Sequence, residues 1–318
     1  MRIGLVALDG CLGSAVASLV DIISTAEAVR TTVDAAIPPI ELSIASTRRR
    51  VTASSGMVFS ATRTLRELEE LDVVVVTTLG TFTGAATEAA MEQRDVRAVV
   101  RTLRSIDPER TRLAAACTGV FPLAEAGHLD GRLATTTWFL TPTFRARYPE
   151  VTLDLDRMVV ADGPVLTAGA AFAHIDLGLA ILRSISPELT RHVARLLLID
   201  ERPSQSAYMV YDHLEHNDPL VLAFEGFVRK HLTEQFDVGV ATHAIGTSRR
   251  TLERRTREVL GMSPLDIVQR LRLERAAHLR RTTDLSTEVI ATRVGYANAE
   301  TLRALERRAA RPDAAARG

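Results

Sequence analysis

Short apolar runs alternate with longer amphipathic stretches along the first 185 residues. Four runs have the length and apolar content of buried strands: residues 3–8, 40–45, 73–78 and 113–116. Helical periodicity separates them, around residues 15–30, 87–105 and 119–127. Strands that alternate with helices favour a mostly parallel sheet covered by helices on both faces. The first part of the chain is therefore predicted to be an α/β domain.

Two further elements follow in the same part of the chain. Residues 151–169, VTLDLDRMVVADGPVLTAG, have the pattern of a β-hairpin with Asp162 and Gly163 at its turn. Residues 171–185 then form a mostly apolar helix, which Ser186 and Pro187 would end.

From residue 187 onward the pattern is helical throughout. Helices are predicted near 187–200, 219–234, 238–245, 248–260, 264–281, 287–294 and 298–309. The most linker-like stretches are residues 203–206 and 217–219, and we place the domain boundary between them. The sequence thus predicts a first domain over 1–185, a connecting helix and linker over 186–215, and an all-helical domain over 216–318.

Composition narrows the class of protein. With 46% hydrophobic and 25% charged residues, the chain is typical of a globular protein that buries real cores. The longest uncharged stretch, residues 73–87, is too short to span a membrane, so no membrane partner is expected. The N-terminus has the pattern of a strand and not of a signal peptide. The two cysteines form no zinc-binding spacing and no disulfide framework, so we expect no metal and a cytoplasmic location.

Charge is distributed unevenly, although the chain carries 39 basic and 39 acidic residues. Residues 246–318 contain 16 arginines against 9 acidic residues, a net charge of +7, which leaves −7 on the rest of the chain. Arginine suits bidentate contacts to phosphate and guanine. A basic region joined to an acidic body indicates a nucleic-acid-binding module, although a solvated arginine-rich surface would give the same charge count.

Two helix-turn-helix candidates stand about 50 residues apart in this basic region. In VATHAIGTSRRTLERRTREVLG, Gly246 permits the tight turn and Ser248 can cap the next helix. In STEVIATRVGYANAETLRALERR, Gly295 serves the turn and Asn298 the cap. The segment MSPLDIVQRLRLERAAHLRR between them has a capping serine, proline at the first helical position and apolar residues at helical spacing. It predicts a rigid helix that joins the two units.

These segments resemble the AraC/XylS family of transcription regulators over residues 220–308. The resemblance rests on GTSRRTLERR, LGMSPLDIVQRLRLERAAHLR and IATRVGYANAETLR. It implies an all-α tandem helix-turn-helix domain whose recognition helices enter successive major-groove segments of DNA. The candidate DNA-binding residues are Ser248, Arg249, Arg250, Arg254, Asn298, Glu300, Arg303 and Arg307, the last at a phosphate.

The basic region also departs from that family. Thr256 and Glu306 stand where an aromatic residue usually packs each recognition helix onto its own unit. Loss of a buried aromatic can cost about 3 kcal/mol or more if the pocket cannot close. The family's usual ending is replaced by ARPDAAARG. The second helix-turn-helix unit is therefore expected to be less well formed than the first.

Cys117 follows the predicted strand 113–116 and precedes a helix. A strand-to-helix corner presents its apex residue to a cleft, and a helix N-terminus lowers the pKa of a thiol. Three interpretations are open: a nucleophile, a residue lining a pocket, or a small buried residue. A nucleophile also needs a base and a group that orients the base.

The segment CTGVFPLAEAGHLDGRLATTTWFLTPTFRARYP, with TAGAAFAHIDLGLAIL downstream, resembles the PfpI-like, class I glutamine-amidotransferase-like superfamily. Over residues 1–185 the chain is most similar to the GlxA-type regulators, which couple such a domain to an AraC-type domain. The resemblance implies a flavodoxin-like α/β sandwich with a mostly parallel sheet and with Cys117 on its nucleophile elbow.

Compared residue by residue, the catalytic set is incomplete. Thr118 and Thr137 stand where relatives carry a histidine, and Ala15 stands where the isonitrile-hydratase-like members need an aspartate. Asp21 falls on a later acidic position of that helix. His128 and His174 lie in helical stretches and are expected to be structural. We therefore predict no catalytic residue and no cofactor. The candidate effector-pocket residues are Cys117, Thr118, Gly119, Gly80 and Asp21.

The leading hypothesis is a sequence-specific DNA-binding transcription regulator that responds to a small-molecule effector and forms a homodimer. One alternative is a PfpI-like enzyme of the hydratase or amidase type, which would use Cys117 with Asp21 as its base. Another is an interaction protein that has lost DNA binding, for which Thr256, Glu306 and the altered tail would be the support.

Overall fold

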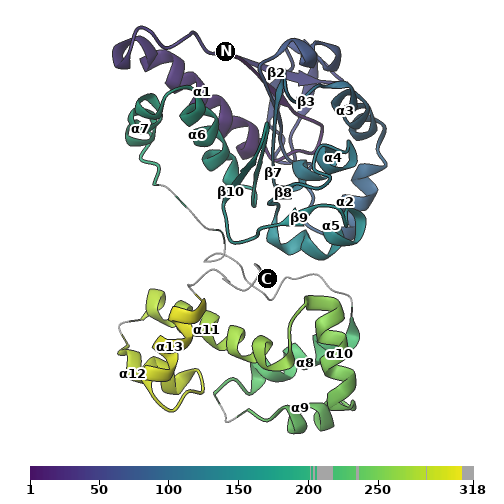
Figure 1. Cartoon of the computed structure of the whole chain (residues 1–318), viewed down its shortest axis with the longest axis vertical. Coiled ribbons are helices and arrows are strands. Elements are labelled where there is room, and N and C mark those ends of the chain that lie inside the picture. Colours follow the sequence, from purple (N-terminus) through teal and green to yellow (C-terminus); the bar gives the residue numbers. More distant parts are fainter. Residues whose placement is uncertain (201, 203–204, 206–217, 234–235, 284, 310–318) are drawn as a thin grey trace. The chain divides into compact units, whose positions relative to one another are not determined.

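The computed structural model describes residues 1–200, 202, 205, 218–233, 236–283 and 285–309. The chain divides into two compact units. The first contains residues 1–200, and the second begins, among the described residues, at Asp218 (Figure 1).

The first unit is built on a seven-stranded sheet with the order β10-β11-β7-β6-β1-β2-β5. Its strands are β1 (Arg2–Val6), β2 (Glu41–Ser46), β5 (Arg63–Thr64), β6 (Val73–Val76), β7 (Arg112–Ala116), β10 (Val159–Asp162) and β11 (Val165–Ala168). All neighbours pair in parallel except β10 and β11, which form the expected hairpin around Gly163. All four valines of β6 are buried, because helices cover both faces of a parallel sheet.

Helices lie on both sides of the sheet (Figure 1). One side holds α1 (Gly13–Val33), α6 (Ala173–Ile185) and α7 (Pro187–Leu196), and the other holds α2 (Gly84–Met91), α3 (Arg94–Ser105), α4 (Val120–Glu125) and α5 (Thr141–Arg147). Each side has its own apolar core. The predicted flavodoxin-like α/β sandwich is thus confirmed.

The helix expected over 187–200 belongs to the first unit. Leu189 and Val193 of α7 are fully buried in the same core as α1 and α6. The stretch that joins the units therefore starts after α7, later than the boundary at 185 that the sequence suggested. Most of the linker over 186–215 that follows α7 lies outside the described residues.

Several short elements have no counterpart in the sequence prediction. They are the edge strand β5, the helix α5, the hairpin β3 (Arg50–Thr52) and β4 (Val58–Ser60), the two-stranded sheet β8 (Leu133–Ala134) and β9 (Thr152–Leu153), and three 3-10 turns, Leu65–Glu70, Cys117–Gly119 and Trp138–Leu140. The single helix expected over 87–105 is two helices, because Gln93 between α2 and α3 is extended.

The regular elements among the described residues of the second unit are all helices. It contains α8 (Pro219–Lys230), α9 (Val238–Ala244), α10 (Arg249–Leu260), α11 (Pro264–Thr282), α12 (Thr287–Arg293) and α13 (Ala299–Ala309). The helix α11 contributes Ile267 and Leu271 to one apolar core and Ala276 and Leu279 to the next. It therefore joins the two helix-turn-helix units, as the sequence predicted.

Candidate nucleic-acid interface and the Cys117 corner

The first recognition helix, α10, starts and ends at residues suited to those positions. Gly246 takes a φ of 70° in the turn before it, and the Ser248 hydroxyl accepts a hydrogen bond from Thr251 N at 3.1 Å. Leu252 and Thr256 are fully buried on the inner face of the helix. Arg250, Arg254 and Arg257 are exposed on the opposite face, and Arg249 is exposed at the start of the helix.

The four exposed arginines of α10 differ in their ion-pair partners. Arg249 pairs with Glu253 at 3.1 Å and Arg254 with Glu258 at 2.8 Å, both one turn along the helix. Such exposed pairs contribute about 0–1 kcal/mol, so a DNA phosphate can replace the carboxylate at small cost. Arg250 forms no ion pair with any described residue and is exposed. Arg257 is likewise exposed and forms no ion pair with a described residue, so Arg250 and Arg257 are the arginines of α10 most available for a base or a phosphate.

The second recognition helix, α13, has a similar start. The Asn298 side chain accepts a hydrogen bond from Thr301 N at 2.9 Å. Glu300, Arg303 and Arg307 are exposed on this helix, whereas Leu302 is fully buried. The eight candidate DNA-binding residues thus lie at the starts and on the exposed faces of α10 and α13.

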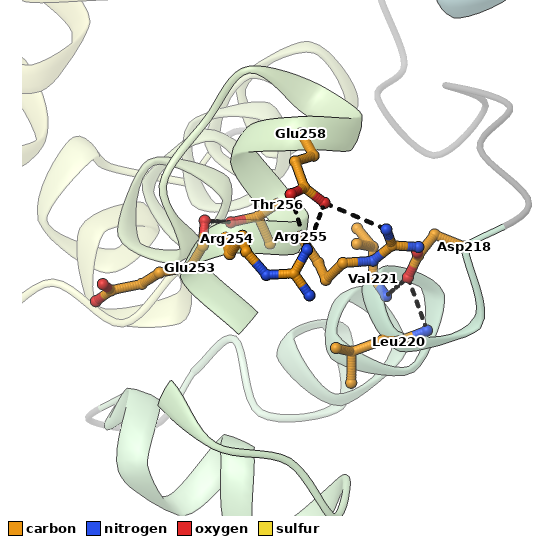
Figure 2. Close-up of polar contacts among 8 residues, drawn as sticks. All are labelled: Asp218, Leu220, Val221, Glu253, Arg254, Arg255, Thr256 and Glu258. Atoms are coloured by element: carbon orange, nitrogen blue, oxygen red, sulfur yellow. Dashed lines mark hydrogen bonds and ion pairs between the residues drawn. The ribbon is translucent and has the colours of Figure 1, made fainter. Parts of the chain in front are cut away.

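Arg255 reaches from α10 to Asp218 at the start of α8 (Figure 2). It forms an ion pair with Asp218 and another with Glu258 at 3.2 Å. Asp218 also caps α8, since its Oδ1 accepts from the backbone nitrogens of Leu220 and Val221, both at 3.0 Å. The side chain of Asp218 is 5% exposed. Burial alone would raise its pKa, but these hydrogen bonds and Arg255 outweigh burial and lower it.

The two departures from the AraC/XylS pattern are accommodated in different ways. Thr256 is fully buried, and its hydroxyl donates to the carbonyl oxygen of Glu253 at 3.3 Å. Glu306 pairs with Arg280 of α11 at 2.6 Å, which attaches α13 to the central helix through charge and not through an aromatic ring.

Within the second unit of the chain, the turn of the second helix-turn-helix contacts residues next to the first helix-turn-helix. Arg272 of α11 donates to the carbonyl of Leu232 at 3.2 Å and lies over the Tyr296 ring, 5.3 Å from its centre. A Cβ at Gly295 would stand 2.4 Å from the same carbonyl oxygen. The two helix-turn-helix units are therefore closely packed at this point, and only glycine fits.

In the first unit, Cys117 occupies the corner that the sequence indicated. Its φ is 56°, the left-handed region that few residues other than glycine adopt. Its backbone nitrogen donates to Gly169 O at 2.7 Å, and its carbonyl accepts from the Thr136 hydroxyl at 3.0 Å. The side chain is 1% exposed. The corner is thus held at both backbone atoms and closed to solvent.

The neighbouring candidates are explained by close packing. A Cβ at Gly119 would lie 1.6 Å from Thr77 O, and one at Gly80 would lie 1.9 Å from Gly10 O. The Thr118 hydroxyl shares a hydrogen bond of 2.8 Å with that of Thr78 and accepts one from Leu79 N at 2.9 Å. These residues bring the carboxyl ends of β6 and β7 together around the thiol.

The groups around the thiol do not form a catalytic set. Burial raises the pKa of Cys117, opposed by hydrogen bonds that include the hydroxyls of Thr78, Thr118 and Thr137. Asp21, expected in the pocket, lies on the exposed face of α1 and therefore stays apart from this buried corner. Within the described residues, the hydrogen-bonding side chains around the thiol are hydroxyls, with no carboxylate or imidazole among them.

Both candidate histidines are structural. His174 is fully buried, its Nδ1 lies 2.6 Å from Ala171 O, and burial lowers its pKa to about 4. His128 Nε2 lies 2.6 Å from Leu103 O. Each ring is thus engaged by a backbone carbonyl.

One residue at this corner could not be predicted from the sequence. Gln205, which follows α7 in the stretch that leads to the second unit, is 2% exposed. Its Nε2 donates to Thr135 Oγ1 at 2.8 Å and to Thr136 O at 3.2 Å. A single glutamine in a polar, proline-containing stretch has no pattern that would distinguish it from a solvated linker residue.

No described helix is both long and apolar enough to cross a membrane. The described residues likewise contain no group of three or more histidine, cysteine or acidic side chains placed to hold a metal ion.

Comparison with known proteins adds independent information. The profile of the DJ-1/PfpI family matches residues 8–184, more than half of the chain, and a helix-turn-helix domain profile matches residues 241–311. The chain is 30% identical over 251 residues to the HTH-type transcriptional regulator CdhR of Pseudomonas aeruginosa, an alignment that covers 77% of this chain and 71% of CdhR.

Two further relatives match shorter stretches of the chain. The HTH-type transcriptional regulator GlxA of Rhizobium meliloti is 27% identical over 208 residues, 64% of each protein. The isonitrile hydratase of Pseudomonas putida is 30% identical over 151 residues, which are 46% of this chain and 60% of the enzyme.

Proposed function

Since this chain belongs to the DJ-1/PfpI family and carries an AraC-type helix-turn-helix domain beside that fold, we propose that α10 and α13 read its operator under the control of a small effector. The chain is a DNA-binding transcription regulator and not an enzyme. CdhR and GlxA, two of its relatives, are likewise named as transcriptional regulators. We propose that it acts in the cytoplasm.

One observation carries the DNA-reading proposal: all the candidate arginines of α10 are exposed, and Arg250 and Arg254 lie on the face opposite its buried side. Arg249, Arg250 and Arg254 would contact bases and phosphates from the first helix, with Ser248 at its start. Asn298 and Arg303 would do so from the second helix, Glu300 would accept a hydrogen bond from a base edge, and Arg307 would contact a phosphate.

The test is a DNA titration of the full chain with the region upstream of its own gene. Arg250→Ala is expected to weaken binding about tenfold at fixed salt, because a base-contacting arginine contributes about 1–3 kcal/mol. Arg101→Ala, an exposed arginine of the first unit, is the matched control and should leave affinity unchanged. Equal affinities for wild type and Arg250→Ala would contradict the assignment.

The effector proposal rests on the closed corner around Cys117. Strand ends of open α/β sheets gather ligands, and Cys117, Thr118, Gly119 and Gly80 meet at two such ends, β6 and β7. The hydratase activity named for one relative does not extend to this chain in our proposal, because the thiol is buried among hydroxyls. The corner would sense a ligand and leave it unchanged.

We also propose a homodimer, on the resemblance to regulators of this architecture. Sedimentation of the full chain tests it. A mass twice that of the 34.7 kDa chain is expected, and a monomer at micromolar concentration would contradict it.

A further inference from the structure

The side chain of Gln205 is enclosed by the first unit although the residue lies in the stretch leading to the second. Its backbone nitrogen donates to Asp156 O at 3.2 Å, and its amide nitrogen faces three acceptors. These are Thr135 Oγ1 at 2.8 Å, Thr136 O at 3.2 Å and Arg157 O at 3.5 Å. All three are neutral oxygens, so the site is built to receive an uncharged N–H donor.

The other half of the same amide is poorly accommodated. Gln205 Oε1 is buried and has no hydrogen-bond partner among the described residues. It lies over Gly169, where an added Cβ would stand 2.3 Å from it. A buried acceptor without a donor is destabilising, so this side chain is held less well than a ligand that satisfied both of its ends.

The Gln205 site is continuous with the Cys117 corner. Thr136, whose carbonyl accepts from Gln205, donates its hydroxyl to Cys117 O at 3.0 Å. Gly169, which lies under the amide, accepts from Cys117 N at 2.7 Å. Gln205 therefore covers the backbone side of a corner that is otherwise closed to solvent.

We propose that Gln205 occupies a ligand subsite of the first unit, and that the effector is a small neutral molecule with a primary amide that binds by displacing it. An ammonium ligand would be buried against neutral oxygens without a counter-charge, which favours the neutral amide. This inference rests on the proposed effector-controlled function and names the ligand class for it.

Displacement would release the linker at one of its two described anchors. Arg202, the other anchor, donates to Phe172 O at 2.7 Å and pairs with Asp176. At the far end of the linker, Asp218 begins the second unit and pairs with Arg255 of the recognition helix α10. The stretch that carries Gln205 is thus covalently continuous with a residue that holds the DNA-reading helix.

The subsite is tested by refilling it. In full-length Gln205→Gly, the vacated space should take propionamide, which reproduces the lost side chain. Propionamide at millimolar concentration is expected to raise the melting temperature of this variant by about 3 °C, and that of the wild type by much less. Propionate, of the same shape but with no N–H donor, should give no rise. Gln205→Ala, tested with acetamide because the Cβ remains, replaces Gln205→Gly should that variant fail to fold.

Gly169→Ala is the matched control. Its Cβ would occupy the position of Oε1, and Gly169 does not have a positive φ, so alanine is tolerated by the backbone. This variant should expel Gln205 and yet give no response to propionamide. An equal rise with propionate, or no rise in either Gln205 variant, would overturn the subsite.

DNA binding by the wild-type chain separates this inference from the proposed function. Operator binding together with no propionamide response would overturn the subsite alone. Absence of operator binding would overturn the proposed function, whatever the response to propionamide.

Discussion

At the residue scale, local surroundings decide what each polar or reactive side chain can do. Cys117 stands on a corner suited to a nucleophile, but burial raises the pKa of its thiol and its neighbours are hydroxyls. Asp218 is as buried as many core residues, but hydrogen bonds and Arg255 keep its carboxylate charged. Neither state follows from the residue type, since each depends on partners far away in the sequence.

The thiols provide the first prediction. Burial raises the pKa of Cys11 to about 11 and also raises that of Cys117, so both are protonated near neutral pH. We expect neither to react rapidly with Ellman's reagent at pH 8 in the folded protein, and both to react after unfolding in guanidinium. A fast-reacting thiol that is lost in Cys117→Ser, and retained in Cys11→Ser, would restore the nucleophile hypothesis.

Asp218 provides the second prediction, which concerns the pH dependence of stability. Its pKa is lowered on folding, so its contribution to stability is fully present above the pKa of the unfolded carboxyl, near 4, and is lost as the pH falls through the lower, folded value. Asp218→Asn should lower the free energy of unfolding of the second unit at pH 7 by about 1–2 kcal/mol and flatten its dependence on acidic pH. Urea unfolding at pH 7 and pH 3 measures both. An unchanged pH profile would show that the pair with Arg255 contributes nothing.

At the element scale, the sequence predicts what repeats and misses what does not. Four buried strands, the β10–β11 hairpin and the helices of the second unit follow from apolar periodicity and from caps such as Ser248. The sheets β3–β4 and β8–β9 have strands of two or three residues, too short to show alternation. The break at Gln93 carries no glycine or proline. Gln205 was missed because its role depends on tertiary contacts alone.

The turns of the two helix-turn-helix units give a matched pair of variants. Gly246 and Gly295 both have positive φ, 70° and 83°, but only Gly295 is in close contact with other atoms. Gly246→Ala should lower the free energy of unfolding by about 1 kcal/mol through backbone strain. Gly295→Ala should cost at least twice as much, because its Cβ meets the Leu232 carbonyl and Arg272. Equal losses of unfolding free energy in urea would show that the two helix-turn-helix units are not closely packed at Gly295.

At the scale of the whole molecule, charge and fold are divided along the same line. The arginine-rich region 246–318 lies in the helical unit, and the acidic remainder includes the α/β unit. The sequence placed the two folds and the basic region correctly because composition and period change together along the chain. It did not place α7, whose buried leucine and valine belong to the first core.

The measurement that tests the central claim most directly is operator binding by the full chain across a salt series. Affinity for the region upstream of its own gene is expected to fall by about two to three orders of magnitude between 50 and 200 mM salt, and to exceed affinity for a scrambled duplex at every salt concentration. A sequence-specific regulator requires both results. Equal affinity for the two duplexes, or no salt-dependent binding, would contradict the account.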